Sequence, residues 1–391
     1  VVKIGITCYP TFGGSGVVAT ELGIALAQRG IDVHFISYAL PSRLSMIHER
    51  IRFHEVTMMN YPLFDNFPPY TLALATKMAE VASYENLDIL HVHYAIPHAI
   101  SAYLARQMVP DHPLRIVTTL HGTDITLVGR DPGYLPITRF GIDSSDGVTA
   151  VSEWLRRETH ASLDVRREIE AIPNFVDPSR FRKSDNFVCR GFVHPGEKLL
   201  GHVSNFRPVK RVQDVLEVFL RVSRRMPARL VMIGDGPERS RAEAFCRDHR
   251  ISDRVLFLGN VPNLEEVLGS LDLFLLPSET ESFGMAALEA LASEVPVIAS
   301  AAGGLPEVVD DGVDGYLLPV GDVDAMAERA MELLGNDERR RSFGRAGREA
   351  AVERFHVGKV VPRYLAYYER VLRTERRQEE PERRQVEARH E

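Results

Sequence analysis

Several features are scarce in this sequence of 391 residues. Its three cysteines, Cys8, Cys189 and Cys246, lie far apart and match no metal or disulfide spacing, which favours a reducing, cytoplasmic compartment. No apolar run approaches about 18 residues and no signal peptide is evident, so we expect no membrane association. The dinucleotide-binding fingerprint G-x-G-x-x-G is also missing, which counts against a nicotinamide oxidoreductase built on two Rossmann-like halves.

An excess of positive charge is missing as well. The chain has 47 basic and 54 acidic residues, a net charge of −7, which argues against non-specific nucleic-acid binding but leaves room for local phosphate sites. Hydrophobic residues make up 45% and charged residues 26%, as in an ordinary globular protein. The length exceeds what one hydrophobic core usually supports, so two domains are expected.

Short apolar strands alternate with amphipathic helices along most of the chain, which predicts an α/β protein with two doubly wound parallel sheets. We place the linker near residues 173–180. The predicted parts are a first domain at 1–175, a second domain at 176–355, a helix at 356–373 that crosses back to the first domain, and a charged tail at 374–391.

The stretch 277–307 organises the second half, and it reads as strand end, acidic loop, helix, strand and glycine-rich loop. Glu289 is the single charge in an otherwise apolar helix, and an unpaired buried carboxylate is costly. Its donors are either hydroxyl groups of a bound sugar or an Arg or Lys elsewhere in the chain. Free N–H groups at the helix start, near Gly284, would suit a phosphate.

Polar residues gather where predicted strands end. A glycine-rich turn at 13–16 and a basic turn at 205–211 each join a strand to a helix. Ligands of open α/β sheets bind outside the carboxyl ends of the strands. The first-domain residues expected at such ends are Ser15, Tyr94, Thr118, Thr119, His121 and Asp124.

Two short patterns could suggest a metal. His91 and His93 share one face of a predicted strand but have no third ligand nearby, so we predict no metal site there. Asp322 and Asp324 form the only closely spaced D-x-D pair, and they are better explained as helix capping.

The pattern of Glu281 and Glu289 in E-x7-E, followed by Gly303-Gly-Leu-Pro-Glu307, resembles the retaining GT-B glycosyltransferases of family 4. Nearly the whole chain shares the likeness. Further segments resemble the members that start bacillithiol synthesis by transferring GlcNAc from UDP-GlcNAc to the hydroxyl of L-malate. These segments are residues 4–10, 13–23, 91–98, 118–126 and 204–214.

The resemblance implies a role for each matching residue. Glu289 would bind the ribose of UDP, Glu281 would lie by the transferred sugar, and Lys210 would bind the diphosphate. Asn205 stands where the family usually has an arginine, so either Arg207 or Arg211 compensates, or Asn205 meets the acceptor. The implied donor-binding residues are Gly14, Asn205, Arg207, Lys210, Arg211, Phe283, Gly284, Met285, Ala286 and Glu289, and the implied catalytic ones are His121, Lys210 and Glu281.

The implied acceptor site must hold a small dicarboxylate close to the sugar. Its candidates are Ser15, Tyr94, Thr118, Thr119, Asn205 and Arg254. The resemblance further implies a cytoplasmic homo-oligomer, a dimer or tetramer, that uses no cofactor and no metal.

Two alternatives stay open. The chain could transfer to another small anionic acceptor, such as an inositol phosphate, or it could bind a nucleotide sugar without catalysis. The presence of His121, Glu281 and Glu289 counts against the second alternative.

Overall fold

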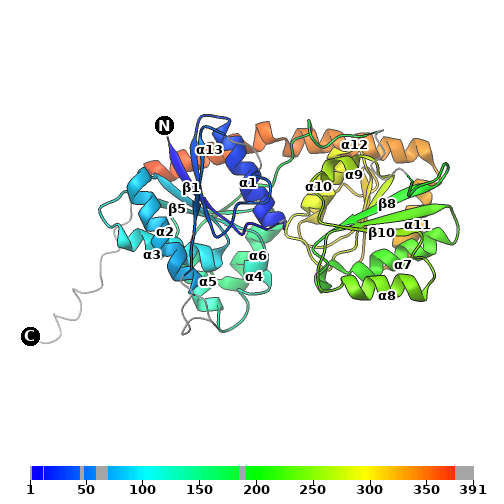
Figure 1. Ribbon diagram of the computed structural model, residues 1–391, viewed down its shortest axis with the longest axis horizontal. Coiled ribbons are helices and arrows are strands. Elements are labelled where there is room, and N and C mark those ends of the chain that lie inside the picture. The colour runs from blue at the N-terminus through cyan, green and yellow to red at the C-terminus, as the bar shows by residue number, and fades with distance from the viewer. Residues whose placement is uncertain (1, 12, 45–47, 59–68, 185–190, 375–391) are drawn as a thin grey trace, which may run out of the picture.

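The computed structural model describes residues 2–11, 13–44, 48–58, 69–184 and 191–374. They form two α/β domains, each built around a parallel sheet, which lie side by side in Figure 1. The predicted fold class is therefore confirmed.

The sheet of the first domain has seven strands in the order β3-β2-β1-β4-β5-β6-β7, and every neighbouring pair is parallel. The order reverses between β1 and β4, whose register pairs Ile4 with Ile89. The strands are β1 (Lys3–Thr7), β2 (Asp32–Ser37), β3 (Ile51–Glu55), β4 (Ile89–His93), β5 (Arg115–Leu120), β6 (Gly147–Ala150) and β7 (Ile169–Ala171).

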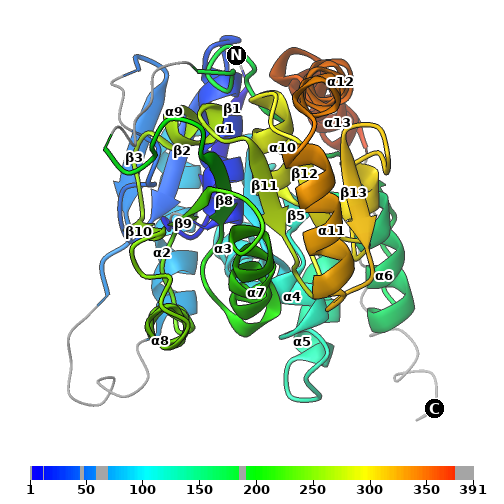
Figure 2. The same ribbon diagram turned by 90° about the vertical axis from the view of Figure 1, so that its right-hand side faces the viewer.

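The sheet of the second domain has six parallel strands in the order β10-β9-β8-β11-β12-β13, which Figure 2 shows side by side. Here the order reverses between β8 and β11. The strands are β8 (Lys198–Val203), β9 (Ala228–Ile233), β10 (Val255–Gly259), β11 (Leu273–Leu276), β12 (Val297–Ser300) and β13 (Gly315–Leu318).

Helices cover both faces of each sheet, because the strands carry apolar side chains on both faces and both must be shielded from water. The helices of the first domain are α1 (Gly14–Ala27), α2 (Tyr70–Glu85), η2 (Ala95–Ala99), α3 (Ile100–Met108), α4 (Thr123–Thr126), α5 (Leu135–Asp143) and α6 (Glu153–Leu163). Those that follow are η3 (Pro208–Lys210), α7 (Val212–Ser223), α8 (Arg239–Asp248), α9 (Leu264–Gly269), α10 (Met285–Ala292), η4 (Leu305–Glu307), α11 (Val323–Leu334), α12 (Asp337–Phe355) and α13 (Val357–Arg373).

We also examined whether any helix could span a membrane. None of the helices in the described residues is both long enough and apolar enough to do so.

The chain crosses between the domains twice, and the two crossings lie together. The Val176 N–H donates to the Phe355 carbonyl at 2.9 Å, and the Val357 N–H donates to the Val176 carbonyl at 3.0 Å. Arg348 of α12 donates to the carbonyls of Pro178 and Phe181 at 3.0 and 2.8 Å. Backbone pairing and a single guanidinium therefore hold the two crossings side by side.

After the second crossing, α13 runs along the first domain (Figure 1). Its apolar stripe joins the core around β1 and α1. The Tyr367 hydroxyl donates to the Val148 carbonyl at 3.0 Å, and the Tyr368 hydroxyl bonds to His91 Nδ1 at 2.7 Å. The last helix thus completes the first domain, although it follows the second in sequence.

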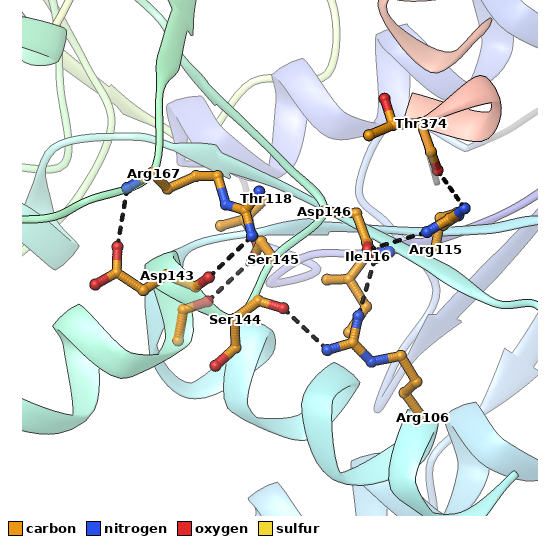
Figure 3. Close-up of polar contacts among 11 residues, drawn as sticks. Arg106, Arg115, Ile116, Thr118, Asp143, Ser144, Ser145, Asp146, Arg167 and Thr374 are labelled. Carbon is orange, nitrogen blue, oxygen red and sulfur yellow. Dashed lines mark hydrogen bonds and ion pairs between the residues drawn. The ribbon is translucent and has the colours of Figure 1, made fainter. Parts of the chain in front are cut away.

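The end of α13 is attached to the first domain by a polar cluster, drawn in Figure 3. The carboxylate of Asp146 accepts hydrogen bonds from the Ile116 N–H, Arg106 and Arg115. Arg115 also donates to the carbonyl of Thr374, directly after the helix. The first residue of β5 is therefore joined to the end of α13 through Arg115.

Candidate active site

A large cleft separates the two domains, with a volume of about 1820 Å³. It lies at the carboxyl ends of both sheets, at the points where each strand order reverses, and this is where open α/β sheets bind ligands. The volume exceeds that of a pocket for one small ligand, so two substrates can share it. Predicted site residues that line it are Gly14, Ser15, Tyr94, His121, Asn205, Arg207, Lys210, Glu281, Phe283, Gly284, Met285, Ala286 and Glu289.

The wall of the first domain is formed by the start of α1 and the end of β4. Gly14 and Ser15 open α1, whose first N–H groups have no side-chain cap. Tyr94 follows β4 with φ of +94°, an unusual conformation for a residue with a bulky side chain. Burial raises the pKa of Tyr94 to about 12, while its hydrogen bond to Ser15 lowers it. A neutral phenol, a serine hydroxyl and free helix amides together favour an anion here.

His121 occupies the floor of the cleft, where the loop after β5 turns back. Its Nε2 lies 2.8 Å from Nδ1 of the buried His93, and burial lowers the pKa of His121 to about 3. Both rings are therefore neutral near pH 7. The Asp124 carboxylate accepts the N–H groups of Ala95, Gly122 and His121, which holds this loop in place.

Opposite this wall, the basic turn after β8 meets the acidic loop after β11. Lys210 Nζ lies 2.6 Å from Glu281 Oε1, which also accepts from the Ser278 hydroxyl at 2.8 Å. Asn205 and Arg207 of the same turn are exposed in the cleft. The cleft wall thus holds one paired ammonium and, as far as the described residues show, one guanidinium without an ion pair, together with the start of α10.

Helix α10 begins at the cleft, where Gly284, Met285 and Ala286 line the wall. Gly284 has φ of +101°, and the helix that follows has no side-chain cap at its N-terminus. Gly303 packs on this loop with φ of +63°, and a Cβ there would lie 2.0 Å from the Glu281 carbonyl oxygen. Only glycine fits this contact, which explains the glycine pair of the G-G-L-P-E segment.

Glu289 has a partner in the structure. Arg43, in the loop after β2, forms ion pairs with two glutamates. Its Nη2 lies 3.3 Å from Glu289 Oε1, and its Nη1 lies 3.2 Å from Glu21 Oε1. Burial raises the pKa of Glu289, and Arg43 opposes that rise. The arginine alternative is thus observed, but Arg43 contacts only one of the two carboxylate oxygens, so the other can still accept ligand hydroxyls.

Four predicted residues lie away from the cleft, and these expectations are corrected. Thr118 and Thr119 lie inside β5, fully buried, because the strand runs on to Leu120. Thr118 bonds to the Ser145 hydroxyl (Figure 3) and Thr119 to His91 and Thr149.

The other two corrections concern arginines. Arg254 precedes β10, at the amino edge of the second sheet, and donates to the Ser223 carbonyl at 3.1 Å. Arg211 turns back to Asp214, with Nε 2.6 Å from Oδ2, so of the two candidate replacements only Arg207 lines the cleft.

The histidine pair and the D-x-D pair considered for a metal make hydrogen bonds within the protein. His91 bonds to Thr119 and Tyr368, and His93 bonds to His121. Asp322 caps α11 by accepting from the Ala325 N–H at 3.1 Å, as predicted.

Sequence reasoning missed Arg43 and the role of Glu307. The carboxylate of Glu307 accepts the N–H groups of Glu153 and Trp154, at 2.9 and 2.6 Å, and so caps α6 from across the cleft. Next to it, the Ser152 hydroxyl donates to the Ser282 carbonyl at 2.6 Å. The G-L-P-E segment was a signal for Glu307, but nothing in the sequence showed its partner helix.

The sequence and the structure were compared with those of known proteins. Two family models match: "Glycosyltransferase Family 4" over residues 12–180 and "Glycosyl transferases group 1" over residues 190–350. Among relatives, N-acetyl-alpha-D-glucosaminyl L-malate synthase of Bacillus anthracis is 50% identical over 376 residues, which are 96% of this chain and 98% of the relative. D-inositol 3-phosphate glycosyltransferase of Nocardia farcinica is 29% identical, and the match covers 85% of this chain and 79% of that relative.

A solved structure shares the fold at low identity. Sucrose-phosphate synthase from Thermosynechococcus elongatus has a TM-score of 0.81 and 20% identity, and the match covers 95% of this chain and 99% of that one. Two parallel sheets facing one cleft, both family matches and a relative that is 50% identical over nearly its whole length lead to one conclusion: the chain is a glycosyltransferase of family 4 with the GT-B fold.

Proposed function

We propose that the enzyme transfers GlcNAc from UDP-GlcNAc to the hydroxyl of L-malate, with retention at the anomeric carbon. The products are N-acetyl-α-D-glucosaminyl L-malate and UDP. The observation that carries this proposal is the 50% identity, across nearly the whole of both chains, with a relative named for that product. The geometry of the cleft is compatible with it on both sides.

On the donor side, we assign the ribose hydroxyls to the second oxygen of Glu289. The diphosphate then lies against the free N–H groups at the start of α10, near Lys210 and Arg207. Lys210, now paired with Glu281, would turn to the diphosphate as UDP-GlcNAc enters, which frees Glu281 to accept sugar hydroxyls. A lysine and a helix N-terminus supply positive charge for the leaving UDP.

On the acceptor side, we place malate between the start of α1 and Asn205. Ser15, Tyr94 and the first N–H groups of α1 donate to carboxylates, and the helix dipole favours their charge. Asn205 extends from the other domain and can donate its amide N–H groups. Of the two alternatives for Asn205, we therefore assign it contact with the acceptor.

In the transfer step, the bond from the sugar C1 to the diphosphate oxygen breaks while the malate hydroxyl oxygen bonds to C1 on the same face. The hydroxyl proton passes to the departing diphosphate oxygen. His121, neutral and held by His93, contacts the sugar and orients it. Catalysis then depends on positioning and on charge stabilisation at the diphosphate.

The test is an assay of purified enzyme with UDP-GlcNAc and L-malate in EDTA. We expect UDP release and a product whose mass and anomeric NMR coupling identify the α-linked glucosaminyl malate. Succinate, which lacks the hydroxyl, is the matched control and should give no product. Turnover with D-inositol 3-phosphate and none with malate would reject the acceptor and keep the reaction class, in line with the Nocardia relative's name.

A further inference from the structure

Three side chains that can bind a metal meet far from the cleft, on the outer part of the first domain. His34 belongs to β2, His54 to the edge strand β3, and Glu85 is the last residue of α2. Their nitrogen and carboxylate atoms all lie within 4.8 Å of one another. Within the described residues this is the one group of three or more such side chains with that spacing. None of the three lines the cleft.

We propose that His34, His54 and Glu85 form a site for a divalent transition-metal ion, zinc in the first instance, which joins β2, β3 and the end of α2. Two imidazoles and one carboxylate are a donor set that zinc uses, with water completing the tetrahedron. Calcium and magnesium prefer oxygen ligands only, so they fit poorly.

The geometry requires little rearrangement. His34 Nδ1 and His54 Nε2 lie 2.9 Å apart. Nitrogens in a tetrahedral zinc site, with bonds of about 2.0–2.1 Å, lie roughly 3.3 Å apart. The rings therefore need to separate by about half an ångström. Glu85 is half-buried at a helix end, where its side chain can turn toward them.

The contact between the two rings also suits a metal. In the metal-free protein, one ring donates to the other across the 2.9 Å contact. Metal binding moves that proton to the far nitrogen of the same ring, without net proton release.

The surrounding charges are nearly balanced. Lys77 is paired with Glu80 at 2.8 Å, and Lys3 Nζ donates to the Glu85 backbone carbonyl at 2.7 Å. Arg52 is exposed to solvent, where its charge is screened. Within the described chain, the Glu85 carboxylate makes no hydrogen bond or ion pair of its own. It is thus available as the anionic ligand.

The test is a titration of the full chain, stripped with EDTA and dialysed, with zinc chloride alone. We expect one zinc per chain with Kd in the low micromolar range or below, and a higher melting temperature with zinc. Cobalt(II) should give the visible spectrum of nitrogen and oxygen ligands without a thiolate charge-transfer band, which separates this site from the cysteines.

Substitutions show where the metal binds. Glu85→Gln and His54→Ala, both at half-buried positions, should each weaken zinc binding at least about tenfold. Glu80→Gln on the same helix and His249→Ala, at an exposed histidine, are matched controls and should bind like the wild type. Absence of a one-to-one site, or binding that survives in both ligand variants, would overturn the proposal. No substrate is needed, so the result is independent of the transfer assay.

Discussion

At the scale of a single side chain, Glu289 is the sharpest test of the donor site. We expect Glu289→Gln to weaken UDP binding about 10–100-fold, because hydrogen bonds to a charged acceptor contribute roughly 1.5–3 kcal/mol. Isothermal titration calorimetry with UDP measures this directly. Arg43→Ala is the control, since it removes the ion pair and leaves the carboxylate. Equal UDP affinity in wild type and Glu289→Gln would rule out the ribose role.

The same residue shows what sequence reasoning could reach. An isolated charge in an apolar helix predicts a buried carboxylate that needs donors, and the structure buries it. Arg43 could not be predicted, because it is 246 positions away and meets Glu289 only when the two domains face each other. Residue type and local pattern predict the need for a partner, while the partner's identity depends on tertiary arrangement.

Among the elements, α13 offers a prediction about stability. Tyr368→Phe removes the 2.7 Å hydrogen bond to His91 Nδ1 and leaves that buried nitrogen without this partner. We expect the free energy of unfolding of the first domain to fall by about 1–3 kcal/mol. Urea denaturation followed by circular dichroism measures it. Tyr84→Phe, at a side chain that is 84% exposed, should change stability by less than about 0.5 kcal/mol.

Element boundaries explain where the site prediction failed. Alternating strands and helices were predictable because the two periodicities differ, and the apolar stripe of α13 was predictable in the same way. The exact end of β5 was not. The strand runs on to Leu120, so Thr118 and Thr119 are core residues and not cleft residues, bonded to Ser145 and Thr149. Arg254 failed for a related reason, since it starts a strand and so lies at the opposite edge.

For the molecule as a whole, Glu307 is one of the residues that link the two domains. Its carboxylate caps α6 of the other domain through two backbone N–H groups. We expect Glu307→Gln to weaken this contact between the domains, seen as a larger radius of gyration in X-ray scattering and a KM for UDP-GlcNAc about 3–10 times higher. Glu153→Gln is the matched control, because that side chain pairs only with its helix neighbour Arg156 among the described residues. An unchanged radius and KM in Glu307→Gln would contradict a role in closure.

Buried histidines set the response of the whole fold to acid. Burial holds the pKa at about 3 or 4 for His34, His91, His98, His121 and His202, and well below its usual range for His93. In the unfolded chain these rings titrate near pH 6.5. The stability they contribute is therefore present above about pH 6.5 and is lost as the pH falls toward their folded values.

Buried carboxyls act in the opposite direction, among them Asp124 and Asp314. Burial raises the pKa of Asp124 to about 6 and that of Asp314 to about 7, so their contribution is present below about pH 4 and is lost as the pH rises through those values. Near pH 5, unfolding adds protons to six histidines and releases them from two carboxyls, a net uptake of about four. We expect stability to fall steeply between pH 6.5 and 5, as measured by urea denaturation at a series of pH values. Asp314→Asn removes one opposing group and should make the fall steeper, whereas a flat profile in the wild type would show that the histidines are not buried and neutral.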